Sequence, residues 1–247
     1  MSVIIPVNQT DDDTAELLIY GVIGEGFFEE GITAKAMKTA FDELPDAVQT
    51  VNLRVNSPGG FVYEALAIHN LLARDHRRIE VDVDGLAASA ASFVIQAAAE
   101  IRAAEKALLM VHRAQGITLG DAPEHAKMAE ILEKHDQSIA SIYAKRTGRR
   151  ASTWLKYMGE ETWFTASEAK EARLVDEVTE AGEATACADR RIAARWQKMP
   201  EAAERYVIDA RRLEEERVAR ARRVAARMRE IETLEAAQPG GRLKILS

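Results

Sequence analysis

Hydrophobic positions recur along the chain with two different periods. Short runs rich in apolar and β-branched residues predict buried strands at 15–23, 48–56, 79–86 and 107–112. Apolar residues three or four positions apart, with charged residues between them, predict helices at 32–44, 61–74 and 122–145. Strands that alternate with helices in this way are typical of an α/β fold.

The segment VDVDGLAASAASFVIQAAAE, residues 81–100, fits neither pattern well because it consists mostly of small and apolar residues. It predicts a strand, a tight turn at Gly85, and a helix that starts near Ser89. Small side chains at a helix start allow another backbone to approach closely, and they equally suit tight helix packing. Both explanations stay open, and Ser92 is a second hydroxyl in the same run.

The C-terminal part of the chain has a different composition. Arg, Glu and Ala dominate residues 190–236, which contain no Gly and a single Pro. This change predicts a compact domain over 1–188 and a charged helical C-terminal extension over 189–247. Strong helix formers predict that 201–236 is helical and ends at the following QPGG. Because its apolar stripe is narrow, we expect either an arm that engages a partner or a helix packed on its own domain.

Composition excludes several classes of function. The net charge of −7 and the isoelectric point near 5.4 argue against a nucleic-acid partner. Cys187 is the only cysteine, so the chain forms no internal disulfide and no cysteine-based zinc site. The N-terminal residues lack a basic region followed by an apolar stretch, and no long uncharged apolar window occurs. We expect a cytoplasmic protein that neither spans a membrane nor binds a metal or cofactor.

Three short segments carry candidate chemistry. NSPGG follows a predicted strand, and its Gly59 and Gly60 can adopt backbone angles that direct N–H groups at an anion. GLAAS places Ser89 at a helix start, where the next N–H could face an oxyanion. LLMVHRAQG places His112 at a strand end, where a neutral imidazole could accept a serine proton. Glycines in such turns and histidines at strand ends are often purely structural, so no segment alone defines a function.

In order and approximate spacing, NSPGG, GLAASAASFVIQAA, MVHRAQG and ETWFTASEAKEARLVDEV resemble segments of the ClpP family of serine peptidases. The resemblance covers roughly residues 15–180 and is greatest for the ClpP-like head maturation proteases of bacteriophages and prophages. It implies a ClpP/crotonase-like spiral of ββα units, with 122–145 as the long handle helix. It also implies hydrolysis of peptide bonds inside a homo-oligomer of stacked rings.

Carried over onto this sequence, the resemblance implies that Ser89 is the nucleophile and His112 the base. Gly59, with Gly60 beside it, and Ala90 match the positions whose N–H groups form the oxyanion hole.

The third member of the triad is where this sequence departs from the family. The family has an aspartate before the segment that corresponds to TWFTA, and here that position is Glu161. Glutamate is one methylene longer, so its backbone must lie slightly differently if it is to reach the histidine. Asp136 is the second candidate for the acid, and Glu160 also competes for this role.

Phage-type relatives imply capsid or scaffold proteins as substrates, in a bacterium or phage-infected host, and make an ATPase unfoldase the less favoured partner. Two other functions stay open. A crotonase-like enzyme would use the paired N–H groups of NSPGG and GLAAS to hold a thioester enolate. A non-enzymatic assembly module would keep the fold and act through the charged extension. Signal peptide peptidases pair serine with lysine and need a membrane anchor that this sequence lacks.

Overall fold

The computed structural model describes residues 7–9, 13–25, 31–180, 188–189, 196–204 and 207–208. The chain divides into two compact units, Met1–Val207 and Ile208–Ser247. Within the expected helix 201–236, the structure describes a short helix α8 (Glu201–Glu204) and a two-residue strand β10 (Val207–Ile208). The prediction is confirmed for 201–204 and wrong at 207–208, where the chain pairs as a strand with β9 (Ala188–Asp189). Its other residues lie outside the described residues. The expected boundary after residue 188 stays a prediction.

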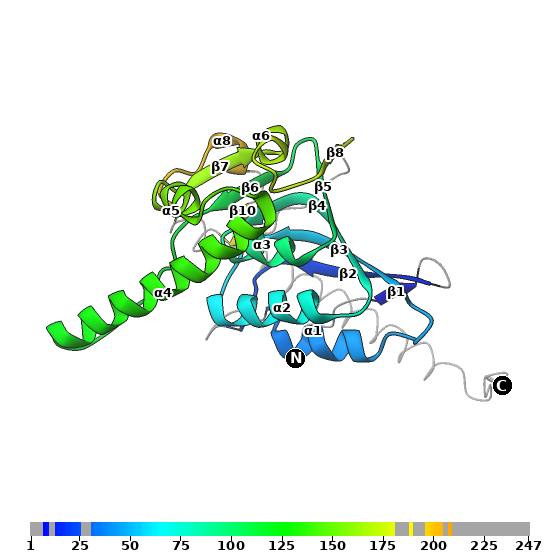
Figure 1. Ribbon diagram of the computed structural model, residues 1–247, viewed down its shortest axis with the longest axis horizontal. Helices are drawn as coiled ribbons and strands as arrows, with labels where there is room; N and C mark the ends of the chain where they lie inside the picture. The colour runs from blue at the N-terminus through cyan, green and yellow to red at the C-terminus, as the bar shows by residue number, and fades with distance from the viewer. Residues whose placement is uncertain are drawn as a thin grey trace, which may run out of the picture. The chain divides into compact units, whose positions relative to one another are not determined.

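A mostly parallel sheet forms the centre of the first unit (Figure 1). Its main path runs β1-β2-β3-β4-β5-β8, and β6 and β7 branch from β4. The strands are β1 (Val7–Gln9), β2 (Thr14–Tyr20), β3 (Thr50–Ser57), β4 (Arg78–Ala88), β5 (Glu100–Ala104), β6 (Leu108–Val111), β7 (Thr162–Thr165) and β8 (Glu177–Thr179). Neighbours from β2 to β8 pair in parallel, and β6 is parallel to β4, whereas β1 with β2 and β7 with β6 are antiparallel. The expected α/β class with a mostly parallel sheet is confirmed.

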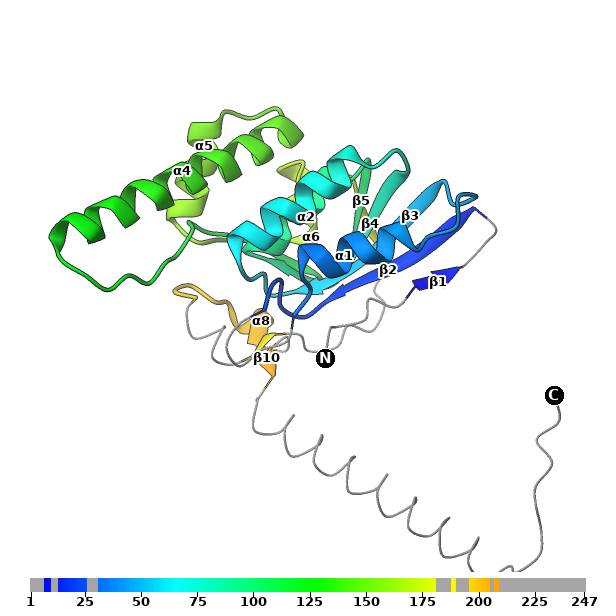
Figure 2. The same cartoon turned by 90° about the horizontal axis from the view of Figure 1, so that it is seen from below.

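Helices α1 (Ala34–Asp42) and α2 (Val62–Arg74) lie on the same side of the sheet, as Figure 2 shows. Alternate strand residues point toward them, so each strand shows the period of two that a half-covered sheet requires. The buried residues of this layer include Leu17, Leu53, Val81, Met37, Phe41, Ile68 and Leu72.

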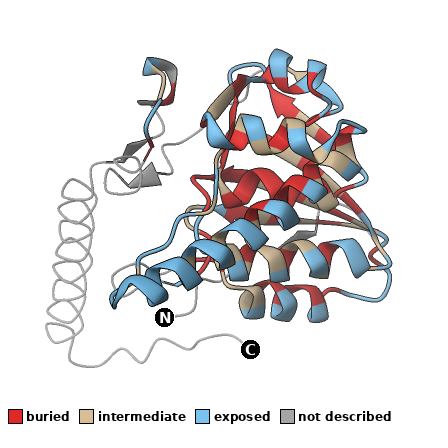
Figure 3. Ribbon diagram, turned by 60° about the vertical axis from the view of Figure 1, so that its left-hand side comes forward, coloured by how far each residue is buried: buried red, intermediate tan, exposed pale blue. Residues whose placement is uncertain are grey.

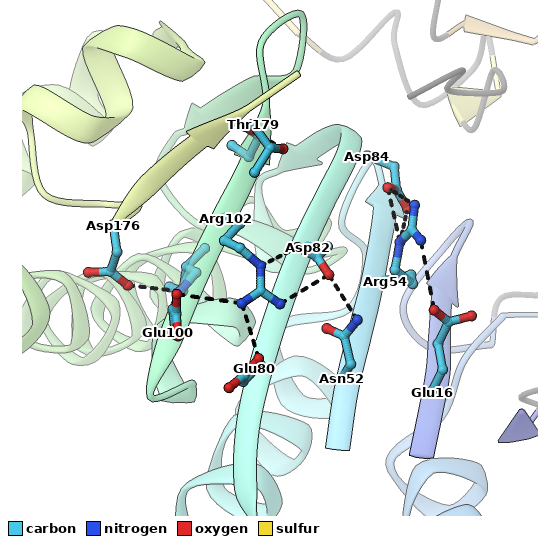
Figure 4. Close-up of polar contacts among 12 residues, drawn as sticks. Glu16, Asn52, Arg54, Glu80, Asp82, Asp84, Glu100, Arg102, Asp176 and Thr179 are labelled. Atoms are coloured by element: carbon cyan, nitrogen blue, oxygen red, sulfur yellow. Dashed lines mark hydrogen bonds and ion pairs between the residues drawn. The ribbon is translucent and has the colours of Figure 1, made fainter. Parts of the chain in front are cut away.

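The opposite face of the same strands carries a ladder of charged and polar side chains (Figure 4). Arg102 donates to Asp82 at 2.7 Å and to Glu80 at 3.0 Å. Arg54 pairs with Asp84 on the neighbouring strand. Parallel sheets are usually covered on both faces. Here one face stays partly exposed, and its charged side chains form ion pairs between adjacent strands.

The structure corrects the prediction for residues 81–100. Gly85 lies within β4, which continues to Ala88, and no turn breaks the strand there. The register against β3 shifts between Val55 and Ser57, so the first half of β4 pairs with β5 and its last residues pair with β6. The helix is short, with α3 at Ala90–Val94 and a 3-10 turn at Ile95–Ala97. Residues 100–104 form β5, an element that the sequence pattern did not reveal.

The long helix expected at 122–145 is confirmed as α4 (Ala122–Thr147). Asp121 and Glu124 form a capping box at its start, and Gly148 ends it with a φ of 72°. Most residues of its first half are exposed, whereas its second half packs against α5 (Ala151–Gly159) and the core (Figure 3). Across the described ranges, no helix is both long and apolar enough to cross a membrane.

Candidate active site

Ser89 lies at the carboxyl end of β4, directly before α3. Its N–H donates to the carbonyl of Met110 at 2.9 Å, which continues the pairing of β4 with β6. Its φ is 52°, an angle that non-glycine residues rarely adopt. The strand is therefore followed by a strained residue that is partly exposed.

His112 follows directly after β6 and lies beside Ser89. Its Nε2 is 2.6 Å from the Ser89 Oγ, within the range expected for a nucleophile and its base. Burial lowers the pKa of His112 below its ordinary value, and the negative charge of Glu161 partly opposes this shift. The imidazole is thus held in the neutral form that can accept a proton.

Glu161 precedes β7 and lies next to His112 through the pairing of two strands. Val111 pairs with Thr162 in the antiparallel β6–β7 ladder, so the next positions along each strand are His112 and Glu161. Glu161 is 7% exposed and has a φ of 49°. In the described part of the chain, no carboxylate accepts a hydrogen bond from the other ring nitrogen of His112, but Glu161 is the charged group that acts on its pKa.

Asp136 and Glu160, the competing acids, have other partners. Asp136 is buried in α4 and accepts a hydrogen bond from the Ala114 N–H at 2.8 Å. Its second oxygen lies 3.6 Å from Arg113, so Asp136 fixes the loop that follows the histidine. Glu160 is exposed and lies 4.0 Å from Lys156.

The NSPGG loop packs directly against the serine. A Cβ on Gly59, whose φ is 89°, would lie 2.7 Å from both the Ala90 nitrogen and the Ser89 Cβ. Only glycine tolerates both that backbone angle and that approach. The two polar residues before Pro58 hold the loop in place, because Asn56 accepts from the Leu86 N–H at 3.1 Å and Ser57 donates to the Gly21 carbonyl at 2.6 Å.

The two glycines differ in the state of their N–H groups. The Gly59 N–H donates to the Ser57 Oγ at 3.1 Å. Among the described residues, no partner accepts a hydrogen bond from the N–H of Gly60 or of Ala90. Ala90 directly follows the serine, and Gly60 directly follows the glycine that packs against it. Each of these N–H groups is free to donate to an oxyanion.

Ser92, the second hydroxyl of the Ala-rich run, is fully buried. Its Oγ donates to the Ser89 carbonyl at 2.6 Å and lies 2.7 Å from the hydroxyl of Tyr143 on α4. The Ser92 hydroxyl is therefore used in hydrogen bonds that hold the backbone of Ser89. Its role as a nucleophile has no geometric support.

Comparison with known families agrees with this geometry. The family model for Clp protease matches residues 29–182. This span covers more than half of the sequence, so the chain belongs to the Clp protease family and is a serine-type peptidase. Membership implies protein substrates and ring-shaped oligomers.

Several residues around the site were not found from the sequence. The backbone N–H groups of Gln197 and Lys198 both donate to the Glu161 carboxylate at 2.6 Å. Trp163 donates to the same carboxylate at 3.4 Å. Every residue except proline has a backbone N–H, so the residue types at 197 and 198 give no sign that these positions donate to Glu161.

Proposed function

We propose that the chain is a serine endopeptidase in which Ser89 attacks the peptide bond, His112 is the general base, and Glu161 orients the histidine. The distance of 2.6 Å between the Ser89 Oγ and the His112 Nε2 carries this proposal. The two residues follow adjacent parallel strands, and the carboxyl ends of such strands are where α/β proteins place their ligands.

In this mechanism the His112 Nε2 accepts the Ser89 proton as the Oγ bonds to the scissile carbonyl carbon. The carbonyl oxygen becomes an oxyanion, and the N–H groups of Gly60 and Ala90 donate to it. His112 then returns the proton to the leaving amine, which departs and leaves an acyl-enzyme. Water, deprotonated by the same histidine, attacks the acyl carbonyl and releases Ser89.

The substrate class follows from the sequence motifs. The four ordered motifs together resemble the phage and prophage members of the family more than ClpP proper. The charged extension lies outside the family match. The enzyme accordingly cuts capsid or scaffold proteins during phage head assembly, within stacked rings and without an ATPase partner. The exposed first half of α4 is available for a contact between rings.

A fluorophosphonate probe tests the catalytic assignment. The full chain should be labelled at Ser89, and Ser89→Ala should abolish the labelling. Ser141→Ala is the matched control, because Ser141 is an exposed serine on α4 whose hydroxyl donates only to its own helix. A wild-type chain that stays unlabelled, or labelling that survives in Ser89→Ala, would contradict the assignment and favour a crotonase-like enzyme or an assembly module.

Co-expression tests the biological role. The wild-type enzyme, but not Ser89→Ala, should shorten the capsid or scaffold protein encoded beside it, with a new terminus detectable by mass spectrometry. Intact capsid and scaffold proteins beside an enzyme that still cleaves a fluorogenic peptide would reject the phage role and leave the peptidase assignment in place.

A further inference from the structure

The carboxylate of Glu161 is held by a segment that lies outside the match to the Clp protease family. Its Oε2 accepts from the Gln197 N–H and its Oε1 from the Lys198 N–H, each at 2.6 Å. The side chains of both donors are exposed, so this segment contributes its backbone to the site. Two short N–H bonds to one carboxylate are charge-assisted and fix the position of both oxygens.

Apolar contacts anchor the same segment beside the catalytic strands. Trp196 is buried, and its ring lies edge-on to that of Trp163 with 5.2 Å between centroids. Trp196 and the buried Ala203 belong to a small apolar cluster whose other buried members come from β4 and β6, namely Leu86, Ala88, Leu108 and Met110. Ala88 immediately precedes the serine, and the Met110 carbonyl accepts from the Ser89 N–H. The cluster therefore ties 196–204 to the strands that carry Ser89 and His112.

Trp163 joins the apolar anchor to the polar contact. Its ring packs on Trp196, and its indole N–H donates to the Glu161 Oε1 at 3.4 Å. Without residues 196–198, this indole would be the remaining hydrogen-bond donor to the carboxylate among the described residues. A buried carboxylate with one long hydrogen bond would either draw in water or change its rotamer.

We propose that residues 196–198 act as a positioning element that completes the catalytic site, with the N–H groups of Gln197 and Lys198 holding Glu161 beside His112. This inference rests on the proposed function, since it takes Glu161 as the acid that orients the base. It assigns the start of the C-terminal extension to the peptidase itself, whatever the role of the residues that follow.

Loss of this contact has two consequences for His112. The acid is no longer fixed, so the imidazole loses its orientation, and misplacement of a catalytic group by about 1 Å costs on the order of 100-fold in rate. The negative charge of Glu161 also moves away, which removes the effect that raises the pKa of His112. Arg113 directly follows the histidine and lies 3.6 Å from Asp136, and among the described residues Glu161 is the charged group that shifts the pKa of His112.

Proline substitutions in the full-length chain test the proposal, because proline has no N–H to donate. Gln197→Pro and Lys198→Pro should each lower kcat/KM for a fluorogenic peptide about 10- to 100-fold. The acid limb of the kcat/KM profile should move to lower pH. Gln197→Ala and Lys198→Ala are the matched controls, since they retain the N–H and remove only an exposed side chain. Both controls should stay much closer to the wild-type rate and pH profile than the matching proline variants.

Trp196→Ala provides a second variant that leaves every backbone donor intact but removes the anchor. It should reproduce the loss in kcat/KM and the shift of the acid limb while the peptidase core still melts cooperatively. Wild-type kinetics in Trp196→Ala or in the folded proline variants would overturn the proposal. Alanine controls as impaired as the proline variants would also overturn it. Labelling of Ser89 by the fluorophosphonate probe is measured first in the wild-type chain. A wild-type chain that is not labelled would contradict the proposed function, whereas the kinetic comparison of the variants tests the contact between Glu161 and residues 197 and 198.

Discussion

The hydroxyl groups of Ser92 and Tyr143 lie 2.7 Å apart in the buried layer beneath the candidate nucleophile. Ser92 Oγ also donates to the Ser89 carbonyl at 2.6 Å, so Tyr143 is the donor in the contact between the two hydroxyls. The chain of hydrogen bonds runs from Tyr143 on α4 through Ser92 to the backbone of Ser89. It holds the carbonyl of a residue whose φ is 52°.

Removal of this support should cost both stability and activity. Tyr143→Phe leaves the Ser92 oxygen without its donor, so we expect a loss of about 1 kcal/mol in the free energy of unfolding. Labelling of Ser89 by a fluorophosphonate should slow severalfold. Urea denaturation and labelling kinetics measure the two effects. Ser141→Ala is the control, and a Tyr143→Phe variant with wild-type labelling would show that the hydroxyl only fills space.

Strain at Ser89 predicts a trade-off between stability and catalysis. Glycine adopts a positive φ without steric cost, so Ser89→Gly should raise the free energy of unfolding by about 1 kcal/mol. Ser89→Ala keeps the strain and should leave stability near the wild-type value. Both variants should be inactive. Equal melting temperatures for the glycine and alanine variants would argue that the surrounding structure relaxes the strain.

Close packing of Gly59 against the serine predicts that alanine is not tolerated there. A Cβ would lie 2.6 Å from the Ala88 carbonyl oxygen, so Gly59→Ala should lower the free energy of unfolding by about 2 to 4 kcal/mol and abolish labelling. Gly21→Ala is a matched control, because Gly21 has a φ of 100° but a Cβ there would meet no atom within 4 Å. The control should lose about 1 kcal/mol and stay active. Similar losses of stability and labelling in Gly59→Ala and Gly21→Ala would show that the close packing of Gly59 against the serine has no special role.

The choice between the two buried acids predicts unequal effects on the rate. Glu161→Gln should lower kcat by more than about tenfold, because the amide can neither stabilise the imidazolium nor accept from both N–H groups of the C-terminal segment. Asp136→Asn should lower kcat much less, since Asp136 binds the Ala114 N–H and not the histidine. Steady-state kinetics on a fluorogenic peptide compare the two. The reverse order would identify Asp136 as the acid.

Burial of His112 predicts the pH dependence of the reaction. Activity needs the neutral imidazole, and burial lowers its pKa below the ordinary 6.5. The neutral form therefore persists as the pH falls through 6.5, and the acid limb of kcat/KM should have its midpoint below that value. Glu161→Gln removes the charge that opposes the shift, so its midpoint should lie lower still. A wild-type midpoint above 6.5 would contradict this expectation.

The assembly expected from the family also depends on α4. Met128 and Leu132 are apolar residues in the first half of α4, the half proposed for a contact between rings. In the structure both are half-buried, and each lies about 3.4 Å from the position of a Cβ on Gly116 in the preceding loop. Part of the apolar surface of the helix is thus covered within one chain, and the stacking of rings through α4 stays a prediction.

The sequence by itself determined the features that depend on neighbouring residues. Periodicity identified β2, β3, β4 and β6 as strands and α1, α2 and α4 as helices, because the period of apolar positions reflects which face of an element is buried. Asp121, Glu124 and Gly148 mark the ends of α4 through contacts within one helical turn. Ser89 and His112 stood out as candidates because their motifs are short and contiguous.

Only the tertiary structure decided how distant segments meet. The sequence pattern assigned no element to residues 101–104 after the Ala-rich run, and pairing with β4 and β8 made 100–104 a strand through hydrogen bonds to two neighbours. The register of β6 against β7 placed Glu161 next to His112. The N–H groups of Gln197 and Lys198 reached the Glu161 carboxylate through a contact that residue types do not encode. Such contacts depend on the packed fold, since backbone donors are the same in every residue but proline.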